Sequence, residues 1–158
     1  MMKIVALDPG KTTGYSVGYL KDDDPIFKFE SMQGRYDHGG LYHLLEGILP
    51  DWIVCESFEF RNKVRAGTEL ISAELIGVVH LYTHFFKNGL TFQNASTHGA
   101  GGNNGAFQNS ILKQKGIYKS GKPHAMDSLR ILLYWYEFGQ GFQFNKRQGY
   151  QELMVHHL

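Results

Sequence analysis

The stretch that decides the fold is Lys3-Ile-Val-Ala-Leu-Asp8, followed by Pro9-Gly-Lys-Thr-Thr-Gly14 and then by Gly14-Tyr-Ser-Val-Gly-Tyr-Leu20. The first run is short and apolar and stops at an aspartate and a Pro-Gly turn. This is typical of a buried strand that ends in a carboxylate. The last run is rich in residues that favour strands and lies close enough to form a hairpin with the first. The start of the chain therefore predicts a β-hairpin with Asp8 at its turn.

Beyond this hairpin, β-rich runs alternate with stretches of helical spacing. Pro123 suits the first turn of a helix, whereas Asn88-Gly89 and Gly116 suit helix ends. The segment 99–105 (GAGGNNG) has no packing side chains and predicts a mobile loop. Further strands are predicted at 26–32, 52–56 and 90–94, and helices at 41–48, about 68–87, 107–115 and about 123–138. This order predicts a single α/β domain over residues 1–158, with a mixed five-stranded sheet flanked by helices.

Composition limits the class of protein. The chain has 158 residues, of which 42% are hydrophobic and 20% are charged, which suits one compact domain with a real core. The single cysteine, Cys55, excludes a disulfide framework and a cysteine-based zinc site. No apolar run reaches the roughly 18 residues of a membrane span, and the N-terminus lacks a signal-peptide core. We therefore expect a cytosolic protein with no membrane segment.

The charge is divided unevenly along the chain. The net charge is only +1, yet residues 1–60 hold five Lys and Arg against ten Asp and Glu, and residues 61–158 hold eleven against five. Such asymmetry favours a polyanionic partner for one face of the molecule. Folding could also mix the two halves into an ordinary surface. The total therefore excludes only a uniformly basic coat.

Four residues at strand and helix ends could form a metal site. Asp8 ends the first strand, Glu56 ends the buried run Trp52-Ile-Val-Cys-Glu56, and His124 and Asp127 share one face at the start of the last helix. Two acids at the ends of adjacent buried strands repel each other unless a cation lies between them. Together the four residues could hold one or two Mg²⁺ or Mn²⁺ ions. Asp8 could instead cap a turn, and His124 and Asp127 could cap the helix.

Three motifs carry a family resemblance. The segments Asp8-Pro-Gly-Lys-Thr-Thr-Gly14, Val54-Cys-Glu56-Ser-Phe and His124-Ala-Met-Asp127-Ser-Leu-Arg130 resemble the motifs of RuvC-type Holliday-junction resolvases, most of all the phage-encoded branch. The likeness spans roughly residues 3–135 and includes Glu74-Leu-Ile-Gly77. It implies an RNase H-like fold, a homodimer and Mg²⁺-dependent nicking of branched DNA. A phage-encoded member would work in the host cytoplasm, in recombination, repair or the debranching of replicated DNA.

The resemblance also implies roles for the four residues. It places the acidic site on Asp8, Glu56 and Asp127, with His124 at a position where relatives carry His or Asp. Asp8 would bridge two metal ions, Glu56 would bind one, and His124 with Asp127 would bind the other. Hydrolysis would leave 5′-phosphate and 3′-hydroxyl ends. One departure concerns Ser96-Thr97-His98-Gly99, where phage relatives tend to carry a basic residue.

Basic residues and one helix would make the remaining contacts. The helix at 68–87 is a candidate dimer interface and equally a candidate core helix. Phe58 and Phe60 could open a junction or pack in the core. The residues expected to bind DNA phosphates, which could otherwise be solvated, are Lys11, Arg61, Lys63, Arg65, Lys113, Lys115, Lys119 and Lys122.

Other functions fit parts of this pattern. The chain could be another RNase H-like nuclease that acts on RNA–DNA hybrid or damaged ends, or a non-catalytic DNA-binding relative. The first glycine-rich motif also occurs in actin-like ATPases, where it touches phosphate. Those proteins need two such domains, and 158 residues disfavour them.

Overall fold

The computed structural model describes residues 1–20, 28–58 and 70–138, and the fold is reported for these residues. One mixed sheet has the strand order β3-β2-β1-β4-β5. Strands β1 to β3 pair antiparallel, whereas β4 runs parallel to β1 and β5 parallel to β4. The strands are β1 (Met2–Asp8), β2 (Thr13–Leu20), β3 (Phe29–Gly34), β4 (Trp52–Glu56) and β5 (Gly89–Gln93). The predicted five-stranded mixed sheet is confirmed.

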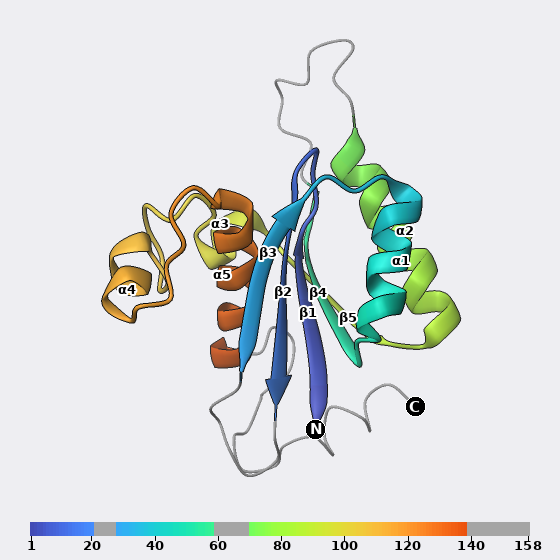
Figure 1. The fold of residues 1–158 in the computed structure, drawn as a ribbon, viewed down its shortest axis with the longest axis horizontal. Helices are drawn as coiled ribbons and strands as arrows, with labels where there is room; N and C mark the ends of the chain where they lie inside the picture. The colour runs from blue at the N-terminus through green and yellow to red at the C-terminus, as the bar shows by residue number, and fades with distance from the viewer. Residues whose placement is uncertain (21–27, 59–69, 139–158) are drawn as a thin grey trace.

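Helices cover both faces of the sheet (Figure 1). Helices α1 (His38–Ile48) and α2 (Ile71–Phe86) lie on one face, and α5 (Pro123–Phe138) lies on the other. Beside α5 lie two short helices, α3 (Ala95–His98) and α4 (Asn109–Gln114). Helix α3 was not predicted, because four residues are too few to leave a periodic signature. Within the described ranges, no helix has the length and apolarity that crossing a membrane requires.

The alternation of side chains along β1 and β4 divides the core into two layers. Val5 and Leu7, with their neighbours on β4, pack against α1 and α2. Ile4 and Ala6 face the other way and pack with the buried side of α5. Because strand side chains alternate with a period of two, Asp8 and Glu56 fall on the α5 face.

Two predicted boundaries differ from the structure for local reasons. Strand β3 lies at Phe29–Gly34 rather than 26–32, and residues 26 and 27 lie outside the described ranges. Helix α2 ends at Lys87, which takes the left-handed cap conformation that was predicted for Gly89. Gly89 instead begins β5, where a Cβ atom would lie 2.1 Å from the Trp52 ring. This glycine is therefore required by packing rather than by helix capping.

Candidate active site

The acidic site begins at the carboxyl ends of two adjacent parallel strands. The register pairs Leu7 of β1 with Cys55 of β4, so Asp8 and Glu56 follow side by side at the same edge of the sheet. Both project toward α5, because each is one step beyond a residue that faces the other layer. The sequence prediction that these two carboxylates share one edge is consistent with this geometry.

Helix α5 brings the third part of the site onto this edge. Its first turn crosses β2 at Gly14, where a Cβ atom would lie 1.9 Å from the carbonyl oxygen of His124. Only a glycine allows this approach, which places His124 Nδ1 2.9 Å from Asp8 Oδ2. A proton on Nδ1 then donates to the carboxylate. The first and third motifs therefore meet through a backbone contact as well as through their side chains.

The electrostatics of Asp8 reflect a concentration of negative charge. The pKa of Asp8 is raised from 3.8 to about 6, mainly by burial and also by the carboxylates of Glu56 and Asp127. The hydrogen bond from His124 opposes these effects and lowers the pKa. The negative charges of Glu56 and Asp127 therefore act on the pKa of Asp8, as expected of neighbouring carboxylates.

Glu56 faces a histidine that the sequence analysis did not assign to the site. Oε2 of Glu56 lies 3.0 Å from Nε2 of His98, whose side chain is fully buried. The contact lacks hydrogen-bond geometry, so Glu56 Oε2 and both ring nitrogens of His98 have no hydrogen-bond partner among the described residues. His98 lies in the segment 96–99, which departs from the phage relatives, and because its side chain is buried it is not a surface group that could contact DNA.

Asp127 is held by groups that sequence reasoning also missed. Arg130, which is only 1% exposed, donates from Nη1 to Asp127 Oδ1 at 2.6 Å. The backbone N–H of Gly101 donates to the same oxygen at 2.9 Å. The glycine-rich segment 99–105, predicted as a mobile loop, is thus tied to the acidic site. The i, i+3 spacing of Asp127 and Arg130 was the signal that could have predicted their pairing.

The side chains at this edge fit a divalent cation by their chemistry. Oxygen donors from Asp8, Glu56 and Asp127 are the ligands that Mg²⁺ and Mn²⁺ prefer. The raised pKa of Asp8 and the unpartnered buried Oε2 of Glu56 are the features that a bound cation would relieve. Among the described residues, no three Asp, Glu, His or Cys side chains lie close enough together to hold a metal ion without rearrangement.

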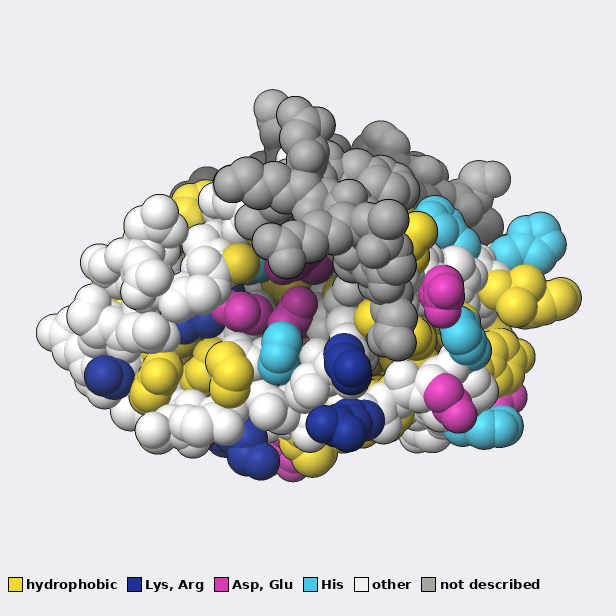
Figure 2. All heavy atoms as spheres, turned by 90° about the horizontal axis from the view of Figure 1, so that it is seen from above, with side chains coloured by type: hydrophobic (Ala, Val, Ile, Leu, Met, Phe, Trp, Pro, Cys, Tyr) yellow, Lys and Arg dark blue, Asp and Glu magenta, His cyan; other side chains and the backbone are white. Residues whose placement is uncertain are grey.

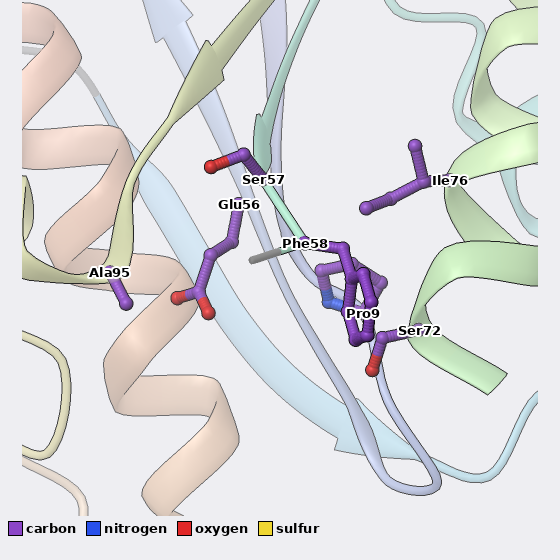
Figure 3. A pocket seen from close by; sticks show the side chains of 7 residues that line it. All are labelled: Pro9, Glu56, Ser57, Phe58, Ser72, Ile76 and Ala95. Atoms are coloured by element: carbon purple, nitrogen blue, oxygen red, sulfur yellow. The ribbon is translucent and has the colours of Figure 1, made fainter. Parts of the chain in front are cut away.

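A pocket of about 200 Å³ lies beside Glu56 (Figure 3). Glu56 and Ala95 lie on one side of it, and Ser72 and Ile76 of α2 lie on the other. Its full lining is Pro9, Glu56, Ser57, Phe58, Ser72, Ile76 and Ala95. The pocket therefore opens next to the acidic edge, on the side nearer α2.

The predicted DNA-binding residues divide into two groups. Arg61, Lys63, Arg65 and the aromatic Phe60 lie outside the described residues. Lys11, Lys113, Lys115, Lys119 and Lys122 are all exposed. Figure 2 shows acidic side chains and a histidine at the middle of the face seen from above, with Lys and Arg side chains on the same face.

Two of the exposed lysines already have partners. Lys119 Nζ donates to the carbonyl oxygen of Ser31 at 2.9 Å. Lys113 Nζ lies 5.0 Å from the centre of the Tyr118 ring, in a cation–π contact. These contacts hold the ammonium group of Lys119 against β3 and that of Lys113 beside the segment that leads from α4 to α5.

Comparison with known proteins identifies the fold. No protein-family model and no curated protein matches the sequence. Among solved structures, Thermus thermophilus RuvC in complex with a Holliday junction substrate superposes with a TM-score of 0.65 at 13% identity, covering 89% of this chain and 97% of that chain. The fowlpox virus Holliday junction resolvase gives a TM-score of 0.59 at 15% identity, covering 86% and 99%.

The yeast mitochondrial Holliday junction resolvase Ydc2 matches in the same way. Its TM-score is 0.55 at 15% identity, covering 98% of this chain and 84% of that chain. The three structures come from a bacterium, a virus and a mitochondrion, so the likeness is not confined to one lineage. The phage-type branch indicated by the motifs stays a prediction. The chain has the RNase H-like fold shared by T. thermophilus RuvC and the fowlpox virus and yeast mitochondrial resolvases.

Proposed function

We propose that this protein is a metal-dependent endonuclease that resolves Holliday junctions and other branched DNA by phosphodiester hydrolysis. The observation that carries the proposal is that three carboxylates, Asp8, Glu56 and Asp127, lie at one edge of a resolvase-type sheet, near enough for the other two to help raise the pKa of Asp8 to about 6. A site that concentrates negative charge is adapted to bind cations before it binds phosphate. The RuvC structure with a junction substrate supports the same class of substrate.

In the proposed mechanism, Asp8, Glu56, His124 and Asp127 would hold two Mg²⁺ ions, for which Mn²⁺ could substitute. When bound, such ions supply an activated water and neutralise the charge that develops on the phosphate. The hydrogen bond from His124 favours the ionised form of Asp8 that metal binding requires. The role of His124 as a metal ligand together with Asp127 stays a prediction beside this contact with Asp8.

The pocket beside Glu56 is the binding site that we propose for the nucleotide next to the cleaved bond. Pro9, Phe58 and Ile76 provide apolar surface, and Ser57 and Ser72 provide hydroxyl groups. A space of about 200 Å³ accommodates one nucleobase, and aromatic side chains stack on bases of any sequence. We place the unstacked strand of a branched substrate across this pocket.

Exposed lysines would hold the DNA backbone on either side of the site. Lys113 on α4, Lys115 at its C-terminal cap and Lys122 before α5 carry positive charge, and no acidic residue lies between them in the chain. Neutralising Lys115 with Gln should weaken junction binding and reduce the slope of log K against log salt by about one unit. Filter binding over a salt series measures this slope. If a lysine-to-glutamine variant leaves this slope unchanged, that lysine does not contact DNA phosphate.

A homodimer would present two such sites to the two opposed strands of a junction. One exposed stripe of α2 carries Leu81 and Phe85, which lie one turn apart and are 50% and 65% exposed. Another stripe buries Leu75, Val79 and Tyr82 in the core, and Phe86 stacks on Tyr82 at the end of that stripe. We propose the exposed face as the dimer contact.

The experiment that tests the proposed function compares substrates under one set of conditions. Purified protein is incubated with a four-way junction, a fork, an RNA–DNA hybrid and a linear duplex, each with Mg²⁺ or Mn²⁺. We expect paired nicks in the junction, weaker cleavage of the fork, and little cleavage of the other two. Preferred cleavage of the hybrid would assign the protein to a different class of RNase H-like nuclease. Binding of the junction without cleavage of any substrate would indicate a non-catalytic relative.

A further inference from the structure

Arg130 is a buried cation next to the acidic site. It lies one turn after Asp127 on α5 and is only 1% exposed. Removing a guanidinium from water is costly unless its donors are all satisfied. Each of the three guanidinium nitrogens of Arg130 has a partner: Nη1 donates to Asp127, Nε donates to the carbonyl oxygen of Phe107 at 3.0 Å, and Nη2 donates to Asn109 Oδ1. Because the side chain is buried and makes these contacts inside the protein, it does not face DNA.

The glycine-rich segment is shaped around this guanidinium. Gly102 has φ +72°, and a Cβ atom there would lie 2.3 Å from Arg130 Nη2 and 2.4 Å from Asn109 Oδ1. Gly101, the preceding residue, has φ +78° and open space where its Cβ would be. The N–H of Gly101 donates to Asp127, whereas Gly102 leaves room for Arg130. Gly101 therefore contributes a backbone donor to Asp127, and Gly102 provides the space that Arg130 and Asn109 occupy.

The contacts on Asp127 are asymmetric. Arg130 and the Gly101 N–H both donate to Oδ1. Both therefore restrain the same oxygen, and neither occupies Oδ2. A carboxylate fixed in this way has one oxygen used for positioning and the other available for a cation. Outer-shell partners of this kind typically change metal affinity by about 10- to 100-fold when they are removed.

We propose that Arg130 is a positioning residue: it fixes Asp127 so that Oδ2 is available to a divalent cation, and it ties α4 to the acidic site through Phe107 and Asn109. This inference rests on the proposed function, since it assigns Asp127 to a metal site. An ion pair that served stability alone would not need Arg130 and the Gly101 N–H to share Oδ1 of Asp127.

The test measures Mn²⁺ affinity by calorimetry on the whole protein, without DNA. Arg130→Lys keeps the charge but cannot reach Asp127, Phe107 and Asn109 together, so we expect Mn²⁺ to bind about tenfold more weakly or worse. Because changes at Arg130 could also destabilise the fold, thermal unfolding is followed for each variant. Gly102→Ala provides a second probe that leaves every charge in place.

Gly121→Ala is the matched control for Gly102→Ala. Both substitutions place a Cβ at a similar positive φ, but only the one at Gly102 pushes on the guanidinium, and nothing lies within 4 Å of the Cβ position of Gly121. We expect Gly102→Ala to bind Mn²⁺ about tenfold more weakly than Gly121→Ala. Equal affinities for these two variants, with Arg130→Lys at the wild-type value, would overturn the inference. Failure of the folded wild-type protein to bind Mn²⁺ would instead contradict the proposed function.

Discussion

Asp8 shows how function opposes stability at a single residue. Its carboxylate is largely buried, with a side chain 14% exposed, and it lies near two other acids. Burial raises its pKa, so the ionised form that binds metal is the form that folding disfavours. The hydrogen bond from His124 offsets only part of this cost. In the absence of metal, the site is therefore a source of instability above the pKa of Asp8.

This opposition predicts the effect of Asp8→Asn on stability. The pKa of Asp8 is raised from 3.8 to about 6 by folding, so the wild-type protein loses stability as the pH rises from about 4 to about 6. A neutral asparagine removes that loss. Without divalent cations, Asp8→Asn should be more stable than wild type by about 2 kcal/mol at pH 7 and about equal to it at pH 4. Urea unfolding at the two pH values measures the difference, and a pH-independent difference would contradict the assignment.

At the scale of single residues, the sequence predicts the acids but not their partners. Asp8 and Glu56 stand out because each ends a buried apolar run. His98 and Arg130 do not, since a histidine in Ser-Thr-His-Gly and an arginine in a helix resemble surface residues. Their burial depends on how β5, α3 and α5 pack together, which local sequence does not encode. The pairing of Glu56 with His98 and of Asp127 with Arg130 therefore depends on tertiary structure.

Among the elements, α5 does most to assemble the site. It packs on β2, whose α5-facing positions Gly14, Ser16 and Gly18 are small. Ser16 is joined to Ser31 and to Ser128 of α5 by hydroxyl hydrogen bonds of 2.8 Å. Strands and helices with strong periodicity were predicted with nearly correct bounds, including α5 itself. Helix α3 was not predicted, because its four residues form a single turn that is too short to show helical periodicity in the sequence.

The contact between α5 and β2 predicts a large effect of one methyl group. Gly14→Ala would place a Cβ atom 1.9 Å from a backbone oxygen of His124, which cannot move without shifting the helix. We expect a loss of about 1–3 kcal/mol in the free energy of unfolding, and a weaker contact between His124 and Asp8. Gly47→Ala is the matched control, since nothing lies within 4 Å of its Cβ position in α1. Denaturant unfolding that ranked the two variants equally would contradict this view of the packing.

For the whole molecule, charge and apolar surface are both distributed by face. The near-neutral total of +1 combines an acidic edge, which bound cations would offset, with lysines on and after α4. The sequence predicts this separation along the chain, but it cannot show which residues share a face. The fold places the carboxylates at one sheet edge and leaves aromatic residues exposed along α2.

The exposed face of α2 leads to a prediction about assembly. Phe85→Glu should convert the proposed dimer into a monomer, because a charge would replace a large apolar contact at its centre. Sedimentation equilibrium measures the mass. Phe138→Glu is the matched control, since Phe138 is 53% exposed but lies at the end of α5. A monomeric wild-type protein, or a dimer that survives Phe85→Glu, would contradict the proposed contact.

The most direct test of the account compares wild type with Asp8→Asn on one four-way junction in Mg²⁺, with cleavage and binding measured on the same samples. We expect wild type to nick opposed strands. We expect Asp8→Asn to bind the junction with similar affinity but to cleave it at least a thousandfold more slowly, which corresponds to an increase on the order of 4 kcal/mol in the activation free energy. Cleavage by Asp8→Asn at a rate near that of wild type would contradict the assignment of this carboxylate edge as the active site.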